Sequence, residues 1–310
     1  MSIDRLRAQS SAPPPPLGQL VNIGGRQLHL FCLGSGSPTV IIENGNSAFS
    51  IDWALVQPDV AKVTRVCTYD RAGYAWSEKG AANGSVQQTI DDLHLLLRTA
   101  HIRPPYVLVG ASIGGLYTRA YQRRYPEEVV GLVLDDPTGD EGLKYMVKGK
   151  DTPIYEMSRD DMRGAFKPLL NKPPHYDAPT KIEEPFDRLP SKLQPVRLWA
   201  LQKFFAEMDI FNDMITTDSW REEFIALRRQ RLGSAHPLGS LPLIVLGRNQ
   251  NDWNIRQKDL EAMTALSTAG RLIIAENSGH EIHLYRPDLV RRSIREVISA
   301  ARRRGFSLSK

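Results

Sequence analysis

The sequence is poor in cysteine, with only Cys32 and Cys67 among its 310 residues. Two cysteines are too few for the disulfide framework that holds small, loop-rich domains together. Each lies inside an apolar stretch typical of a β-strand, LHLFCLG for the first and TRVCTYD for the second. We therefore expect both to be small buried hydrophobic residues. The length and the 41% hydrophobic content allow a large apolar core.

Long hydrophobic runs are also missing. None approaches the ~20 residues that a membrane-spanning helix needs, so no membrane span is expected. A proline run, Pro13 to Pro16, stands where a signal peptide would carry its apolar stretch, which predicts a cytoplasmic protein. The charge is nearly balanced, with 40 Lys and Arg against 35 Asp and Glu. Because the basic residues are scattered and no nucleic-acid motif accompanies them, no nucleic-acid partner is expected.

No pattern of metal ligands is present either. His280 and His283 are three residues apart in GHEIH, but no cysteine, third histidine or spaced carboxylate pattern joins them. We therefore expect neither a metal nor a cofactor. The oligomeric state is left open by the sequence.

Strands and helices alternate along most of the chain. Residues 1–18 are expected to form a flexible arm, because the prolines at 13–16 fit neither a helix nor a central strand. Apolar runs of strand length then alternate with stretches of helical periodicity. Predicted strands are 20–34 (two strands around Gly24-Gly25), 38–45, 64–70, 105–112, 129–136, 241–247 and 271–276, and predicted helices are 52–61, 85–101, 113–125, 256–266 and 287–303.

Residues 138–241 break this alternation. They hold eight prolines between Pro153 and Pro195, followed by an aromatic-rich helical stretch. Strands separated by helices imply a mostly parallel sheet with helices on both faces. We therefore predict an α/β fold whose core comprises residues 19–137 and 242–310, with a helical cap, residues 138–241, inserted after the sixth strand.

The segment GASIGG, between a predicted strand and a predicted helix, matches the pattern G-x-S-x-G. Gly110 and Gly114 let the backbone turn tightly without a Cβ clash, and Ser112 is then held in a strained conformation with its hydroxyl exposed above the sheet edge. This arrangement predicts a nucleophilic serine rather than a plain tight turn.

A serine hydroxyl needs a base, and His280 is the predicted one. It follows the strand at 271–276 through a short loop, and loops after parallel strands open on one edge of the sheet, where Ser112 lies. His283, one helical turn further on, is the weaker candidate.

The base in turn needs a carboxylate, and here the sequence leaves alternatives open. Asp136 ends the strand at 129–136, and Asp252 lies in the loop after the strand at 241–247. Both aspartates are expected at the same edge of the sheet as Ser112. Asp135 is a third possibility, although it should point to the opposite face from Asp136.

An oxyanion hole needs two donors. We predict the backbone N–H of Ile113, at the start of the helix after the serine, and the N–H of Asn46, in the loop after the strand at 38–45. Gly45 would allow that loop to approach the substrate closely.

Taken together, these features resemble the α/β-hydrolase superfamily over residues 20–303. The segments that carry the resemblance are GASIGG, ENGNSAFSIDW, YDRAGYAWS, VLDDP and SGHEIHLYRPDLV. The family places serine, acid and histidine in that chain order. It often has an aspartate three residues after Gly247, where this chain has Gln250, and this departure favours Asp136 over Asp252. Asp70 and Arg71, in YDRAGYAWS, are expected to lock a turn.

The resemblance implies a serine hydrolase that cleaves carboxylic esters or lactones through an acyl-enzyme. Methionine and aromatic residues of the cap form its own small core in our interpretation, yet they also suggest an apolar substrate pocket. One alternative is an aminopeptidase of the proline-iminopeptidase kind, with Asp160-Asp161 or Glu183-Glu184 holding a free amine. Another is a non-catalytic small-molecule receptor on the same fold.

Overall fold

The computed structural model describes residues 13–80, 84–139, 143–171, 177–208, 210–249 and 253–305, with only the backbone described for 210–212 and 253–256. Of the predicted arm, residues 1–12 lie outside this description. The remainder contacts the core, since Trp76 donates to the carbonyl of Pro14 (2.6 Å) and the N–H of Gly18 donates to His29 (3.1 Å).

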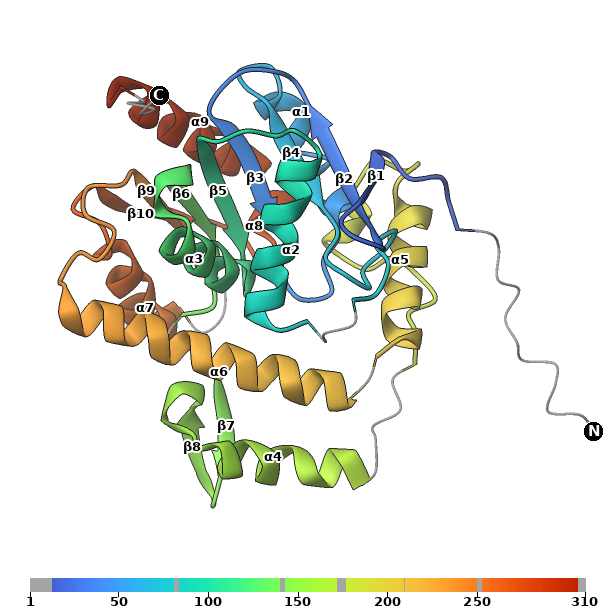
Figure 1. The fold of residues 1–310 in the computed structure, drawn as a ribbon, viewed down its shortest axis with the longest axis vertical. Coiled ribbons are helices and arrows are strands. Elements are labelled where there is room, and N and C mark those ends of the chain that lie inside the picture. The colour runs from blue at the N-terminus through green and yellow to red at the C-terminus, as the bar shows by residue number, and fades with distance from the viewer. Residues whose placement is uncertain are drawn as a thin grey trace, which may run out of the picture.

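An eight-stranded sheet forms the centre of the protein (Figure 1). Its strands are β1 (Gln19–Asn22), β2 (Gln27–Leu33), β3 (Thr39–Glu43), β4 (Val66–Tyr69), β5 (Tyr106–Ala111), β6 (Val129–Asp135), β9 (Leu243–Arg248) and β10 (Gly270–Ala275). They lie in the order β1-β2-β4-β3-β5-β6-β9-β10. Strands β4 to β10 in that order are parallel, and β2 is antiparallel to both β1 and β4. The predicted mostly parallel α/β fold is confirmed.

Helices cover both faces of the sheet. On one face lie α2 (Val86–Thr99), α3 (Gly114–Arg124) and α7 (Trp253–Thr264), and on the other lie α1 (Gln57–Val60), α8 (Ile282–Tyr285) and α9 (Pro287–Arg303). Because both faces are covered, β3 and β5 are buried along their whole length, which explains their unbroken apolar sequences. Ser85 caps the N-terminus of α2, because its hydroxyl accepts the N–H of Gln88.

The described part of the predicted cap contains three α-helices, two short 3₁₀ helices and a small hairpin. The hairpin strands and the α-helices are β7 (Lys144–Val147), β8 (Lys150–Pro153), α4 (Arg159–Asn171), α5 (Gln194–Ala206) and α6 (Ile210–Gly233). Helix α6 lies between the core helices α2 and α3 and the cap helix α4 (Figure 1). The hairpin was not predicted. Met157, Met162 and Phe224 are buried in one cluster with core residues, so they serve packing. The cap limits, 138–241, stay a prediction.

The predicted helix at 52–61 is replaced by two shorter ones, the 3₁₀ helix η2 (Ser50–Trp53) and α1. Pro58 lies in the first turn of α1 and lacks an N–H, so an α-helix cannot continue through it from residue 52.

The expectation for the cysteines was wrong, because Cys32 and Cys67 form a disulfide. They face each other directly in the antiparallel register of β2 and β4, with their Cα atoms 4.0 Å apart. The two strands are neighbours in the sheet although β3 separates them in the chain. The pairing therefore depends on the sheet order, which the spacing of the cysteines does not reveal.

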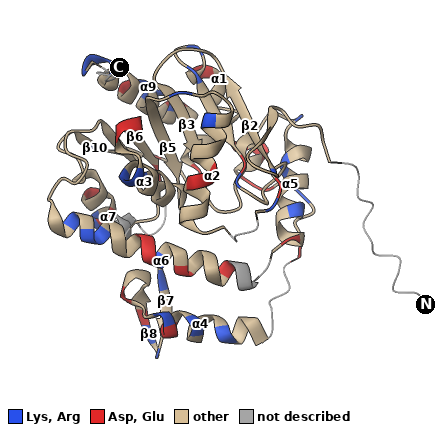
Figure 2. Ribbon diagram, viewed as in Figure 1, with Lys and Arg blue, Asp and Glu red and all other residues tan. Residues whose placement is uncertain are grey.

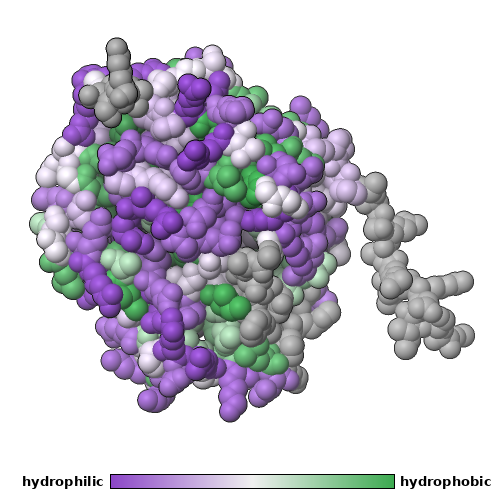
Figure 3. Space-filling view, in the orientation of Figure 1, coloured by the Kyte–Doolittle hydropathy of each residue, from purple (hydrophilic) through white to green (hydrophobic). Residues whose placement is uncertain are grey.

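The surface carries both signs of charge. Asp and Glu lie in the first two thirds of α6, and Lys and Arg are concentrated in its last turns (Figure 2). The face shown in Figure 3 is largely hydrophilic with scattered apolar residues. Within the described ranges, none of the helices has the length and apolar character required to cross a bilayer.

Candidate active site

Ser112 lies in the tight turn between β5 and α3, with a positive φ of 54° that side chains rarely adopt. The turn leaves no room beside its glycines. A Cβ at Gly110 would clash with the carbonyl of Gly114, and a Cβ at Gly114 would clash with the carbonyl of Glu43. The strained conformation keeps Ser112 partly exposed at the end of the buried strand.

Asp136 follows β6 directly and is fully buried. Its Oδ2 lies 2.5 Å from Nδ1 of His280, whose side chain is 39% exposed. Arg248, at the end of β9, donates to the same oxygen from Nη1 (2.8 Å) and to Oδ1 from its backbone N–H (3.3 Å). The carboxylate is thus held from two sides while one edge of His280 faces solvent. Asp252 lies outside the described residues.

Ser112 and the end of β6 are joined by backbone hydrogen bonds. The N–H of Ser112 donates to the carbonyl of Asp135, and the N–H of Thr138 donates to the carbonyl of Ser112, both at 3.0 Å. Ser112, Asp136 and His280 therefore all belong to the segments that follow the carboxyl ends of β5, β6 and β10. Ligand sites of α/β folds occur at this edge.

A second histidine–aspartate pair lies beside the first. His283 Nδ1 is 2.9 Å from Oδ2 of Asp135, and its ring stacks on Trp53 with the centroids 4.5 Å apart. Both side chains are buried, and burial raises the pKa of Asp135. The other ring nitrogen of His283 is buried with no hydrogen-bond partner in the described part of the protein.

The loop after β3 passes next to Ser112. A Cβ on Gly45 would be only 3.2 Å from the Cβ of Ser112, so the loop backbone approaches the serine closely because the side chain is missing. Asn44 holds the loop from below, since its side chain donates to the carbonyl of Tyr69 and accepts from Trp53. The backbone N–H groups of Asn46 and Ile113 have no acceptor among the described residues.

The turn after β4 holds both ends of this loop. Asp70 accepts the N–H and the hydroxyl of Ser50 (2.8 and 3.1 Å), and it also pairs with the buried His29. Arg71 donates to the carbonyls of Asn44 (2.6 Å) and Gly45 (2.5 Å). The sequence indicated that these two residues lock a turn, but not that they hold the loop beside Ser112.

Helix α5, in the predicted cap, contacts the same loop. Arg197 is 97% buried and its Nε lies 3.2 Å from Oδ1 of Asp52, while its Nη2 donates to the carbonyl of Ser47. Its guanidinium also lies over the ring of Phe186, at 3.7 Å. Burial raises the pKa of Asp52, and the charge of Arg197 counteracts this. Sequence analysis did not single out Arg197, since nothing near it in the chain marks its contact with the loop.

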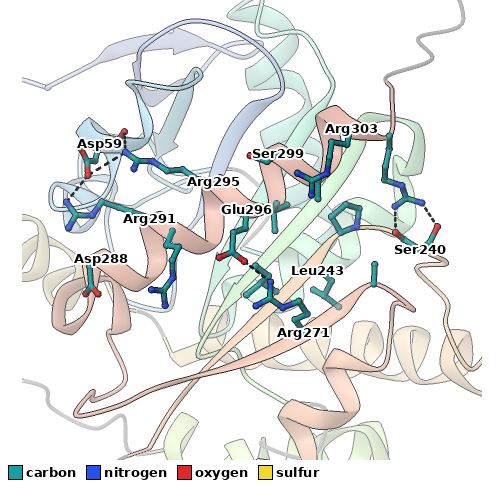
Figure 4. A pocket seen from close by; sticks show the side chains of 17 residues that line it. Asp59, Ser240, Leu243, Arg271, Asp288, Arg291, Arg295, Glu296, Ser299 and Arg303 are labelled. Atoms are coloured by element: carbon teal, nitrogen blue, oxygen red, sulfur yellow. Dashed lines mark hydrogen bonds and ion pairs between the residues drawn. The ribbon is translucent and has the colours of Figure 1, made fainter.

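A large cleft lies elsewhere on the protein. It has a volume of about 1180 Å³ and runs along α9 past the starts of β9 and β10, at the opposite edge of the sheet from Ser112. Figure 4 shows that three of its arginines are engaged with acidic neighbours, Arg291 and Arg295 with Asp59 and Arg271 with Glu296. No group of three or more potential metal-ligating side chains occurs in the part of the chain that the structure describes.

The fold and the sequence place the chain in a known family. The pattern described as the alpha/beta hydrolase fold matches residues 38–287, and the chain belongs to this family, which confirms the predicted resemblance.

Several curated proteins share part of the sequence. An uncharacterized protein of Schizosaccharomyces pombe is 31% identical over 169 residues, which cover 45% of this chain and 31% of that protein. The uncharacterized protein YqjL of Bacillus subtilis is 32% identical over 104 residues, 34% of this chain and 41% of that protein. A 2-hydroxymuconate semialdehyde hydrolase of a Pseudomonas species is 31% identical over 153 residues, 47% of this chain and 53% of that protein. The chain thus spans about half the length of these relatives or less.

Solved structures show the same fold over most of the chain. A thermophilic esterase from Thermogutta terrifontis has a TM-score of 0.62 at 20% identity and covers 89% of this chain and 94% of its own. Est816, an N-acyl homoserine lactone degrading enzyme, has a TM-score of 0.59 at 18% identity and covers 90% of this chain and 99% of its own.

Proposed function

We propose that the protein is a serine hydrolase that cleaves carboxylic esters or lactones bearing apolar groups. The observation that carries this proposal is the hydrogen bond between His280 and Asp136, at the same sheet edge as Ser112 in its strained turn. With its Nδ1 proton donated to Asp136, the imidazole of His280 has Nε2 available as an acceptor. Membership of the α/β hydrolase family and its esterase and lactone-degrading structural neighbours support the same reading.

In the proposed reaction, Oγ of Ser112 attacks the substrate carbonyl carbon while Nε2 of His280 takes the hydroxyl proton. Asp136 stabilises the imidazolium that forms. The N–H groups of Asn46 and Ile113 donate to the negative oxygen of the tetrahedral intermediate. Its collapse breaks the bond to the alcohol oxygen, which receives the proton from His280. Water, deprotonated by His280, then hydrolyses the acyl-enzyme.

The aminopeptidase alternative has less support. Glu184 is exposed and pairs with Arg188, four residues further on, and Asp160 is exposed and pairs with Arg163. Asp161 accepts hydrogen bonds from the neighbouring Ser158. Each acidic pair thus has a member engaged locally, and none of the four carboxylates is buried. The receptor alternative has no observation of its own in its favour.

The test is labelling by a fluorophosphonate probe together with turnover of p-nitrophenyl esters, lactones and aminoacyl-nitroanilides. We expect the wild type to be labelled at Ser112 and to hydrolyse esters or lactones, and Ser112→Ala to lose both labelling and turnover. A folded wild-type protein that remains unlabelled would support the receptor instead, and turnover confined to aminoacyl-nitroanilides would support the aminopeptidase.

A further inference from the structure

Arg71 is a buried cation bound directly to the loop that passes Ser112. It is 93% buried, and its Nη2 donates to the carbonyl of Gly45 while its Nη1 donates to the carbonyl of Asn44. Nη1 also pairs with Glu43 (2.7 Å), which accepts a further hydrogen bond from the hydroxyl of Tyr69. The guanidinium lies over the rings of Tyr74 and Tyr117, at 4.7 and 5.2 Å. These contacts together hold the guanidinium of Arg71 in one position.

The carbonyl of Gly45 and the N–H of Asn46 belong to the same peptide group. This peptide is trans, since the cis bonds of the described chain all precede proline at other positions. In a trans peptide the C=O and the N–H point in opposite directions within one plane. A hydrogen bond that fixes the carbonyl of Gly45 therefore also fixes the direction of the N–H of Asn46. A charged donor on the carbonyl also draws electron density from the amide, which makes the N–H a stronger donor.

We propose that Arg71 is a positioning residue for the oxyanion hole, which orients and polarises the Gly45–Asn46 peptide so that the N–H of Asn46 is ready to receive the oxyanion. This inference rests on the proposed function. Two further observations agree with it. The N–H of Asn46 has no acceptor among the described residues, and the side chain of Asn46 is held separately by the hydroxyl of Tyr74 (3.0 Å).

The charge of Arg71 and its ion pair with Glu43 determine how Arg71 can influence the oxyanion. Burial by itself lowers the pKa of Arg71, but Tyr74, Glu43 and the neighbouring tyrosines raise it well above its ordinary value, so the guanidinium stays charged. Glu43 forms an ion pair with Arg71, and the opposite charges of the pair largely cancel each other at longer distances. The effect on the oxyanion therefore passes through the hydrogen-bonded peptide rather than through long-range attraction. It depends on the planar fork of arginine, which lysine cannot reproduce.

The experiment compares Arg71→Ala and Arg71→Lys with Arg26→Met. Arg26 is a partly buried arginine that pairs with Asp92 on α2 and not with the loop beside Ser112, and it serves as the matched control. The readouts are kcat and KM for the best ester, and the inhibition constant of a trifluoromethyl ketone analogue, which forms an oxyanion on Ser112. Removing one oxyanion donor typically lowers kcat by about 10²- to 10³-fold. We expect each Arg71 variant to lose about 10²-fold in kcat, with KM changed by less than about threefold.

The trifluoromethyl ketone should bind more weakly to the Arg71 variants by the same factor, whereas Arg26→Met should match the wild type in all three quantities. Added guanidinium should restore part of the activity of Arg71→Ala, and an equal concentration of sodium chloride should not. Because restored activity requires a folded protein, this rescue separates positioning from a folding defect.

The experiment distinguishes failure of the proposed function from failure of the inference about Arg71. If the wild type shows neither ester turnover nor fluorophosphonate labelling, the proposed function and this inference fail together. If the wild type is active but the Arg71 variants change KM and kcat equally, keep their affinity for the ketone, or are not rescued by guanidinium, the inference alone is overturned.

Discussion

Two histidine–aspartate pairs lie side by side at the end of β6, and only one of them is open to solvent. Asp136 pairs with His280, whose side chain is 39% exposed, and Asp135 pairs with His283, whose side chain is 6% exposed. The two aspartates are consecutive in the chain. Asp135 is the last residue of β6, and Asp136 follows it with a positive φ of 43°, so the backbone changes direction between the two aspartates.

The difference shows that a histidine–carboxylate hydrogen bond does not by itself mark an active site. His283 is covered by the stacked ring of Trp53, and its second ring nitrogen has no hydrogen-bond partner in the described part of the protein. No substrate can reach that nitrogen without the protein opening. His280 has the same kind of partner together with access to solvent. We therefore assign the His283–Asp135 pair to stability and propose the His280–Asp136 pair for catalysis.

The largest expected effect is on turnover through the exposed pair. Asp136→Asn should lower kcat by about 10⁴-fold, because asparagine stabilises the wrong tautomer of His280 and cannot stabilise the imidazolium. Steady-state kinetics with the best ester measures this, and unchanged thermal unfolding would show that the variant is folded.

The matched controls for that prediction are Asp135→Asn and Asp252→Asn. We expect both to keep kcat within about fivefold of the wild type, which is small beside the loss that follows when the triad carboxylate is removed. If Asp252→Asn abolished turnover while Asp136→Asn did not, the triad acid would be Asp252. The His280–Asp136 pair would then not be the catalytic pair.

The next effect is on stability through the buried pair. His283→Phe can keep the stacking on Trp53 but leaves the carboxylate of Asp135 without its partner. An unsatisfied buried acceptor costs about 1–3 kcal/mol, so we expect the free energy of unfolding to fall by about 2 kcal/mol. Denaturant titration measures the loss, and kcat should remain close to that of the wild type. Equal stability in His283→Phe and the wild type would show that the pair contributes nothing to the fold.

Much of the sheet and part of the site could be predicted because their signals are local. Fully apolar runs identify β3 and β5, and the spacing of Gly110 and Gly114 around a serine identifies the turn that the structure contains. Alternation along β6 also predicts that Asp135 and Asp136 point to opposite sides, and the two carboxylates do have different histidine partners.

The contacts that sequence analysis missed depend on the order of strands in the sheet. Strand β4 lies between β2 and β3, so Cys67 meets Cys32, and Arg71, just after β4, meets the loop after β3. Neither contact has a periodicity or a spacing in the chain. The segment YDRAGYAWS was a signal for the second contact, because a buried arginine requires partners, but it did not indicate which backbone groups those partners are.

The smallest expected effect is the pH dependence of the buried pair. Burial raises the pKa of Asp135 above its ordinary value of 3.8. The folded protein therefore binds this proton more tightly than the unfolded chain, and the stability that the protonated carboxyl contributes is lost as pH rises from about 4 through the folded pKa. Asp135→Asn does not titrate, so its stability relative to the wild type should increase over this interval. Denaturant titrations at several pH values should show this relative gain as the pH rises. A difference between the two proteins that stays constant with pH would mean that the folded and unfolded states hold this proton equally, and the buried pair would then be no more than a neutral hydrogen bond.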